Sequence, residues 1–236
     1  MRNGEPVLEV ENLRFSYMIR HSIFRKRSYP AIQGVSFSIS SGETVGIIGR
    51  NGCGKSTLLR LIAGIYRPDD GYVKRHCKRV SLLSLALGFD PELTGRDNAV
   101  LSGMLSGSSR VKVESEMDHI IEFADLGAFI DEPIKTYSSG MRARLGFSVA
   151  LKLQTDLLLL DEVLSVGDAN FRAKAEKAMK ERINSQQTVL MVSHSFGQLC
   201  ELCNRVIWID KGKIRAFGDP KELTKEYLAE VSLNQA

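Results

Sequence analysis

Hydrophobic and polar residues alternate along this chain with two different periods, and the change of period divides it into segments. VLEVENLRFSY (7–17) and VSFSISSGE (35–43) alternate with period two, which predicts half-exposed antiparallel strands near the start. TVGII (44–48), LLLLDE (157–162) and TVLMVSH (188–194) contain short, almost wholly apolar runs, as buried parallel strands do. Such strands, alternating with helical patterns, predict an α/β fold with parallel strands at its centre.

Helical periodicity replaces the strand patterns between about residues 96 and 153. Two helices are expected there, and Gly127 is placed as the C-cap of the first. Their apolar positions are Met117, Ile120, Ile121 and Ala124 in one helix, and Met141, Leu145, Val149 and Leu153 in the other. We therefore expect one domain, with a core formed by residues 1–95 and 154–236 and a helical lobe inserted at about 96–153.

The rest of the chain returns to strand and helix signals. We expect helices from Ser56 to about Ile65, from Asp168 to about Asn184, and from near Asp219-Pro220 onward. RVIWIDKGKIRAFG (205–218) predicts a hairpin that turns at Lys211-Gly212.

Composition narrows the classes of protein to consider. Of the 236 residues, 43% are hydrophobic and 25% are charged, which is ordinary for a globular domain. No apolar run approaches the roughly 18 residues that cross a bilayer, and the N-terminus lacks a signal-peptide pattern, so we expect a soluble, cytoplasmic chain. The net charge of +4 is too small to argue for nucleic acid as a partner.

Two local features allow more than one interpretation. Basic residues cluster at 20–27 and 74–79; these segments are either solvated loops and hairpin edges or surfaces near an anionic membrane. Cys200 and Cys203 form a C-x-x-C in a helical pattern with no second Cys or His pair nearby, which favours packed helix residues over a zinc or redox site. Cys53 is interpreted as a small, reduced residue and not as a nucleophile.

A glycine-rich loop follows the apolar strand 44–48. Its pattern, Gly-x-x-x-x-Gly-Lys-Ser between a strand and a helix, is that of a phosphate-binding loop. Glycines let backbone N–H groups converge on phosphate oxygens, and the helix N-terminus adds its positive dipole end. Lys55 supplies a cation for the β- and γ-phosphates, and the Ser56 hydroxyl can ligate Mg²⁺. The expected phosphate-binding residues are Gly49, Arg50, Asn51, Gly52, Cys53, Gly54, Lys55, Ser56 and Thr57.

Acidic residues end one apolar strand, and a histidine follows another. Asp161 and Glu162 come directly after the strand 157–160, where two carboxylates are costly unless a cation meets them. Mg²⁺ bound through Asp161 relieves that cost, and Glu162 can then polarise a water aimed at the γ-phosphate. His194 follows the strand 188–192, and in a phosphate-loop fold this position favours a γ-phosphate contact.

A second anion-binding turn lies in the helical lobe. Ser138, Ser139, Gly140 and Met141 form a small-residue turn that opens a helix, and a helix N-terminus attracts anions. One nucleotide needs only one such anion-binding helix N-terminus. The second therefore predicts a contact with the γ-phosphate of a nucleotide bound to another subunit.

With these motifs in place, nearly the whole chain resembles the ATP-binding subunit of an ABC transporter. The resemblance implies a phosphate-loop NTPase core of the ABC ATPase type, with an antiparallel β subdomain and an inserted α-helical subdomain. It matches residues 49–56 to the Walker A loop, Asp161 to the Walker B acid, Glu162 to the catalytic glutamate and His194 to the switch histidine. YSSGM (137–141) stands at the signature motif, and Ser165 to Asp168 at the D-loop. Tyr17 is the first candidate to stack on adenine, and Tyr29 the second.

The variants of these motifs resemble one subfamily, the exporters of bacterial capsule, O-antigen and teichoic-acid polymers. The pairing of YSSGM with VGDA (166–169) is more specific to this subfamily than any Walker motif. The resemblance implies an ATPase that uses ATP and Mg²⁺ and forms a head-to-tail dimer with a second copy. It also implies two integral-membrane permease subunits, a lipid-linked glycan as cargo, and a peripheral place on the cytoplasmic face of the bacterial inner membrane.

The sequence departs from the wider family in one loop. The glutamine that usually precedes a segment like LTGRDN (93–98) is missing, so Asp90 becomes a candidate for coupling to the membrane subunit. The apolar LLSLALGF (82–89) is a candidate surface for that partner or the glycan, with core packing as the alternative. No C-terminal carbohydrate-binding domain is expected within the 236 residues. The alternatives are an ABC ATPase for a drug, lipid or ion, a soluble non-transport ABC ATPase, and a non-catalytic nucleotide binder.

Overall fold

The computed structural model describes residues 5–20, 26–83, 88–153, 155–161, 168–193 and 195–233. The chain forms two compact units, and we describe each by itself. Unit 1 comprises residues 1–78 and 186–236, and unit 2 comprises residues 79–185. In the described part of the chain, no helix combines the length and apolar character needed to cross a membrane.

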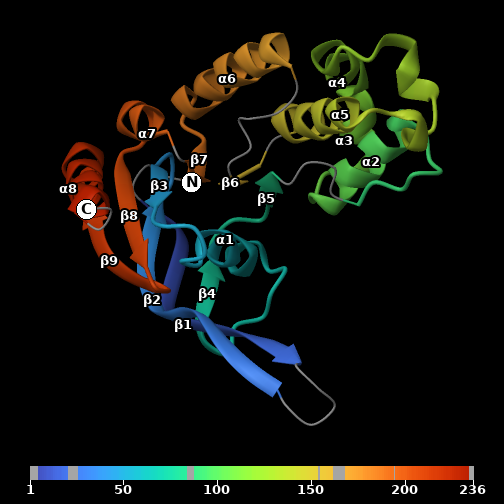
Figure 1. The fold of residues 1–236 in the computed structure, drawn as a ribbon. Helices are drawn as coiled ribbons and strands as arrows, with labels where there is room; N and C mark the ends of the chain where they lie inside the picture. Colours follow the sequence, from blue (N-terminus) through green and yellow to red (C-terminus); the bar gives the residue numbers. More distant parts are fainter. Residues whose placement is uncertain are drawn as a thin grey trace. The chain divides into compact units, whose positions relative to one another are not determined.

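Unit 1 contains a three-stranded antiparallel sheet (Figure 1). Its strands, in the order β2-β1-β4, are β2 (Lys26–Ser40), β1 (Pro6–Arg20) and β4 (Asp70–Arg75). β1 pairs with β4 from Leu8 to Arg14. On its other side it pairs with β2 from Pro6 to Arg20, and Arg20 lies opposite Lys26. The expected antiparallel strands are confirmed, although both are longer than the alternating pattern indicated.

The second sheet of unit 1 carries the predicted parallel strands. Its strands, in order, are β7 (Thr188–Val192), β3 (Thr44–Ile48), β8 (Arg205–Asp210) and β9 (Lys213–Gly218). β3 runs parallel to β7 and β8, and every residue of β3 and β7 is buried. The hairpin β8–β9 turns at Lys211 and Gly212 as predicted, both with positive φ. The helices of this unit are α1 (Lys55–Ala63), α7 (Phe196–Leu202) and α8 (Pro220–Leu233).

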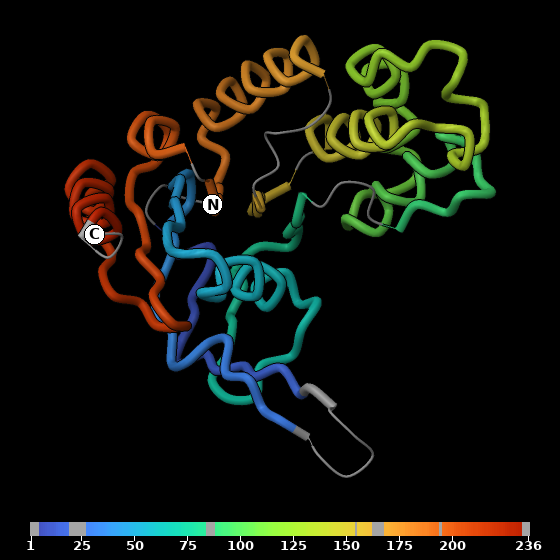
Figure 2. Tube along the Cα trace, in the orientation of Figure 1, coloured from blue at the N-terminus to red at the C-terminus, as the bar shows by residue number. Residues whose placement is uncertain are grey.

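Unit 2 combines two parallel strands with the predicted helices and with two helices that were not predicted, at 95–105 and 110–115. The strands are β5 (Val80–Leu83) and β6 (Leu157–Asp161). The α-helices are α2 (Gly95–Leu105), α3 (Arg110–Ser115), α4 (Met117–Ala124), α5 (Ser139–Lys152) and α6 (Ala169–Asn184). Two short 3₁₀ helices, η1 (Gly127–Asp131) and η2 (Ile134–Thr136), link α4 to α5 along the green-to-yellow part of the chain (Figure 2).

The apolar positions predicted for the two lobe helices, now α4 and α5, form part of the core of unit 2. Leu145, Val149 and Leu153 are buried in one apolar cluster with residues of α4, and Met141 packs against it. The position of the C-cap of α4, however, was predicted wrongly. Asp125 and not Gly127 caps α4, with φ 52° and its N–H on the carbonyl of Ile121. The helix must end there because Leu126 turns back into the core, and Asp tolerates the left-handed conformation.

Candidate functional site

The phosphate loop between β3 and α1 has a backbone that only glycine accommodates at two points. Gly49 and Gly54 have φ of 152° and 110°. A Cβ on Gly49 would lie 2.3 Å from the carbonyl oxygen of Ile209, and one on Gly54 would lie 2.5 Å from that of Ala31. Gly54 is also the N-cap of α1, so the helix begins without a capping side chain. A helix N-terminus of this kind can receive an anion on its N–H groups.

Lys55 is held inside this loop. Its side chain is 7% exposed, and Nζ donates to the carbonyl oxygens of Gly49 at 2.8 Å and Arg50 at 3.1 Å. An ammonium group has three donors, so one remains for a phosphate oxygen once these two are used. The cation is therefore placed in the loop before any nucleotide binds.

The loop has an exposed rim and a buried floor. Arg50, Asn51 and Gly52 are exposed, whereas Cys53 and Gly54 are buried. Burial raises the pKa of the Cys53 thiol above its usual value, which keeps the thiol protonated and a poor nucleophile.

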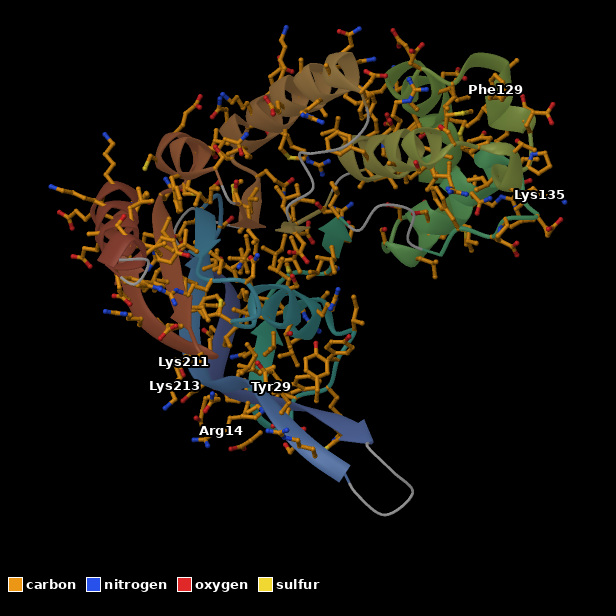
Figure 3. All side chains as sticks on the ribbon, viewed as in Figure 1. Arg14, Tyr29, Phe129, Lys135, Lys211 and Lys213 are labelled. Carbon is orange, nitrogen blue, oxygen red and sulfur yellow. The ribbon has the colours of Figure 1, made fainter. Side chains whose placement is uncertain are left out.

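An aromatic cluster of Phe15, Tyr17 and Tyr66 lies against α1. The Tyr17 hydroxyl is 3.0 Å from the Thr57 hydroxyl, and its ring meets the Phe15 and Tyr66 rings edge-on, with centroids 5.0 and 6.0 Å away. Tyr29 lies directly opposite Tyr17 on the β1–β2 ladder and is exposed (Figure 3). The two adenine candidates are thus neighbours, and Tyr17 is the one whose hydroxyl is hydrogen-bonded to the phosphate-loop helix, through Thr57.

Sequence reasoning missed two members of this cluster. Phe15 shares a strand face with Tyr17, because residues two apart on a strand point the same way, so this signal was present. Tyr66 stacks on Phe15 with ring centroids 5.2 Å apart. It lies in the turn after α1, where no periodicity marks it.

The predicted magnesium ligands lie at the ends of secondary-structure elements. Asp161 ends β6 in unit 2, after four buried leucines, and is itself half-buried. Ser56 is half-buried in the first turn of α1 in unit 1. Hydroxyl and carboxylate oxygens suit Mg²⁺. Among the described residues, no group of three His, Cys, Asp or Glu side chains forms a ready-made metal site.

Three predicted residues lie outside the described residues: Glu162, Ser165 and His194. The elements next to them are as expected. β6 ends one residue before Glu162, and β7 ends two residues before His194. Asp168 is the N-cap of α6, and its carboxylate accepts from the Phe171 N–H at 2.9 Å.

The turn Ser138–Met141 opens α5 on the surface of unit 2. Ser138 is the N-cap, and its hydroxyl oxygen accepts from the Met141 N–H at 3.1 Å. Ser138 and Ser139 are exposed, and Gly140 is half-buried. Directly before them Tyr137 is buried and donates to the Phe129 carbonyl, and burial raises the pKa of Tyr137 to about 12. A buried anchor therefore presents the two serines and the positive end of α5 to solvent.

The remaining candidates have local partners. Asp90 is exposed, and its carboxylate accepts from the Glu92 N–H at 2.9 Å, while buried Asn98 donates to three carbonyls of this loop. In the second basic cluster, Lys74 and His76 pair with Glu9 at 3.7 and 3.3 Å.

The two cysteines of the C-x-x-C pack as helix residues. Cys200 lies on α7 and Cys203 is its C-cap, and burial raises the pKa of the Cys203 thiol to about 12. The tip of the first basic cluster (21–25) and part of the segment 82–89 lie outside the described residues.

Comparison with known proteins identifies the family. The model of the ABC transporter family matches residues 32–165. The O-antigen export system ATP-binding protein RfbB of Klebsiella pneumoniae is 42% identical, over 94% of this chain and 98% of its own. The teichoic acids export ATP-binding protein TagH of Enterococcus faecalis is 44% identical over 88% of this chain, which corresponds to 47% of TagH.

Solved structures agree on the fold. A dimeric ATP-binding cassette bound to ADP and phosphate covers 90% of this chain, and 98% of that cassette is covered, with a TM-score of 0.74 at 20% identity. The ATP-binding subunit of an ABC transporter covers 97% of this chain with 98% of its own, at a TM-score of 0.79 and 20% identity. The chain therefore belongs to the ABC transporter family and has the fold of its ATP-binding domain.

Proposed function

We propose that this chain is the ATP-hydrolysing subunit of an ABC exporter for a lipid-linked cell-surface polysaccharide of the O-antigen, capsule or teichoic-acid type. One observation carries the proposal: the chain is 42% identical to an O-antigen export ATP-binding protein over 98% of that relative. Its place would be the cytoplasmic face of the bacterial inner membrane.

Each predicted site residue has a chemical task in this proposal. The loop 49–57 binds the phosphates of ATP, Lys55 places a cation at the β- and γ-phosphates, and Tyr17 stacks on adenine. Ser56 and Asp161 would hold Mg²⁺, which would supply positive charge to stabilise the phosphate oxygens. Glu162 orients and polarises the attacking water, and His194 contacts the γ-phosphate.

A second copy of the chain completes each site. The turn Ser138–Met141 binds the γ-phosphate of the partner's ATP, and Ser165 and Asp168 line the contact between the two copies. A head-to-tail contact that closes on itself gives a twofold dimer. ATP adds contacts only in the closed dimer, so its binding favours closure and its hydrolysis reverses it. The exposure of Ser138 and Ser139 supports this arrangement.

Two integral-membrane subunits are the proposed receivers of this motion. A pocket of about 430 Å³ on unit 2 supports a docking surface there. It is lined by residues of α2, α3 and α4 and by Leu93, which precedes α2; of these residues, Leu93 is 38% exposed and Met104 is 49% exposed. A cytoplasmic loop with an apolar anchor residue and a polar rim would fit this lining.

Genetic replacement in the native host tests the function. In a strain that carries only Glu162→Gln, we expect surface polysaccharide to disappear and lipid-linked polymer to accumulate in the inner membrane, because ATP binds but is not hydrolysed. The purified parent should show Mg²⁺-dependent ATPase activity that Glu162→Gln reduces by at least about 100-fold. Normal surface polymer in the variant strain would rule out the proposed export function.

A further inference from the structure

Three aromatic rings, those of Phe196, Tyr227 and Trp208, join three elements of unit 1. The Tyr227 ring, on α8, meets the Phe196 ring at the start of α7, with the centroids 5.7 Å apart. It also meets the Trp208 ring of β8 edge-on, at 5.4 Å. Helix α8 accordingly lies beside both α7 and β8 (Figure 1). Tyr227 is therefore the residue through which the start of α7 contacts β8.

Trp208 and Tyr227 also lie close to the phosphate loop. On the ladder between β3 and β8, Trp208 is opposite Ile48, the last residue before the loop. Burial raises the pKa of the Tyr227 hydroxyl, and Cys53 and Arg50 of the loop make smaller, opposite contributions to this pKa. The Tyr227 side chain is thus near the phosphate loop as well as in contact with α7.

Arg215 of β9 fixes α8 against Trp208. Its guanidinium lies over the Trp208 ring, 4.2 Å from the centroid, and it forms an ion pair with Glu230 of α8. Glu230 and Tyr227 are three residues apart, so they lie on the same side of α8. Two contacts therefore hold this side of α8 against β8 and β9.

The start of α7 is tied to the segment 193–195, which contains His194. His194 itself lies outside the described residues, whereas Ser193 and Ser195 on either side of it are described. The Ser193 hydroxyl donates to the side-chain carbonyl of Gln198 at 3.2 Å, and the Ser195 hydroxyl accepts from the Gln198 N–H at 3.4 Å. A shift of the first turn of α7 would therefore move both neighbours of His194.

The last turn of α7 contacts α8 as well. The Cys200 thiol donates to the Pro220 carbonyl at 3.8 Å and lies 3.9 Å from the Thr224 hydroxyl. A thiol is a weak donor, so the ring contact of Phe196 is the stronger of the two attachments. Helix α8 thus determines where α7 starts, chiefly through Tyr227.

We propose that Tyr227 is a positioning residue for the segment 193–195 and, through it, for His194. The inference rests on the proposed function, in which His194 contacts the γ-phosphate of ATP. The Tyr227 ring holds the first residue of α7 at a fixed distance from β8, and so from the phosphate loop. Helix α8, which carries none of the predicted site residues, then takes part in setting the geometry of hydrolysis.

The effect of losing the ring should fall on hydrolysis and not on ATP binding. Leucine in place of Tyr227 removes both ring contacts and frees the start of α7. A reacting group that is misplaced by about 1 Å can cost about 100-fold in rate. The phosphate loop keeps its own support, because Gly49 and Gly54 fit against backbone carbonyls and Lys55 is held by loop carbonyls.

The experiment compares Tyr227→Leu with Phe217→Leu in the 236-residue chain. Phe217 is the matched control, a half-buried aromatic residue of β9 whose ring packs against Phe37 at 6.4 Å. Tyr227→Phe, which keeps the ring, is the conservative variant. For each protein we would measure the affinity for ATP, the rate constant of single-turnover hydrolysis, the melting temperature, and hydrogen exchange of residues 195–202. The rate is also measured for Tyr227→Leu combined with His194→Ala.

We expect Tyr227→Leu to bind ATP within about twofold of the parent, to hydrolyse it at least about tenfold more slowly, and to exchange faster at 195–202. Tyr227→Phe should keep the parent's rate within about twofold, because the ring contacts remain. Phe217→Leu should lower the melting temperature with little change in the rate. In the His194→Ala background, Tyr227→Leu should slow hydrolysis by less than about twofold more, because residues that act as a unit are not additive.

Parent-like hydrolysis and exchange in Tyr227→Leu would overturn the proposal, as would an equal loss of rate in Phe217→Leu. An undiminished tenfold loss in the His194→Ala background would show that Tyr227 does not act through His194. If Tyr227→Leu does not fold, Phe196→Leu, which removes the other ring of the contact, must show the slower hydrolysis and faster exchange in its place.

Hydrogen exchange separates the failure of this inference from that of the proposed function. If the parent does not hydrolyse ATP, the proposed function fails. Unchanged exchange at 195–202 in Tyr227→Leu or Phe196→Leu refutes the positioning role whatever the parent's activity.

Discussion

At the scale of single residues, Lys55 is the cation that we propose binds the β- and γ-phosphates. Its ammonium is already buried against two loop carbonyls, so binding a phosphate requires little rearrangement. For Lys55→Met we expect a folded protein whose ATP affinity falls at least about tenfold, because a charged hydrogen bond is lost. Thermal unfolding with and without ATP and Mg²⁺ measures this, since a ligand of the native state raises the melting temperature.

The control for this measurement is Lys213→Met, which removes an exposed lysine of β9. It should keep the parent's ATP-induced rise in melting temperature. A rise of the same size in Lys55→Met would show that Lys55 does not bind the nucleotide.

The buried thiol of Cys203 should make the free energy of unfolding depend on pH in the alkaline range. The pKa of its thiol is raised by burial to about 12, from a usual value of 9.0. Its contribution to stability is therefore complete below pH 9 and is lost as the pH rises toward 12, because only the unfolded chain releases the proton. At pH 10 the loss is about 1.4 kcal/mol. Urea unfolding between pH 8 and 10 should show a shallower decline in Cys203→Ala than in Cys77→Ala, and equal slopes would contradict the assignment.

Residues could be predicted from the sequence where a local spacing marks them, and were missed where it does not. The phosphate loop was predictable because its glycines have conformations that other residues rarely adopt, which forces a recognisable spacing. Tyr66 was not predictable, since its ring stack on Phe15 depends on a contact between distant segments of the chain. The roles of all the predicted site residues, including Glu162, Ser165 and His194, remain predictions.

At the scale of elements, Ser138 has two expected roles. It is the N-cap of α5, and it belongs to the turn that we propose binds a phosphate. Ser138→Ala should lower the free energy of unfolding by about 1 kcal/mol, because an N-cap acceptor is lost. Ser138→Asp should keep the cap, since aspartate is an equally good N-cap, but should place a carboxylate where a phosphate is expected. We therefore expect parent-like urea unfolding with much reduced ATPase activity in Ser138→Asp. Full activity in that variant would mean that the turn binds no phosphate.

The β8–β9 turn is hydrogen-bonded to the phosphate loop. The Gly212 N–H donates to the Cys53 carbonyl at 3.0 Å, and a Cβ on Gly212 would lie 2.6 Å from the Ala31 carbonyl oxygen. Gly212→Ala should therefore shift the loop and weaken ATP binding, measured with a fluorescent nucleotide. Lys211→Ala, next to it and exposed, should leave ATP affinity unchanged. Equal affinities in the two variants would exclude this supporting role.

Element types were predictable wherever one periodicity dominated. The buried strands β3, β6 and β7 and the apolar stripe of α5 follow directly from it. The extension of β1 and β2 to Arg20 and Lys26 was not expected, because MIR and KRSYP do not alternate. The end of α4 was misplaced because the burial of Leu126, and not the nearest glycine, sets where the helix stops.

At the scale of the whole molecule, the two proposed phosphate-binding elements lie in different units. The phosphate loop belongs to unit 1, whereas the turn Ser138–Met141, Asp161 and Asp168 belong to unit 2. Sequence spacing predicted both elements, because each is a local turn at a helix N-terminus. That the second of them serves another molecule's nucleotide is a statement about assembly, which only a measurement of association can test.

Sedimentation of the purified chain with ATP and Mg²⁺ is that measurement. Glu162→Gln should form an ATP-dependent dimer, and adding Gly140→Asp should return it to a monomer that still binds ATP, because the new carboxylate repels the partner's γ-phosphate. A double variant that dimerises as readily as Glu162→Gln would contradict the claim that the turn at Gly140 completes the nucleotide site of a second copy.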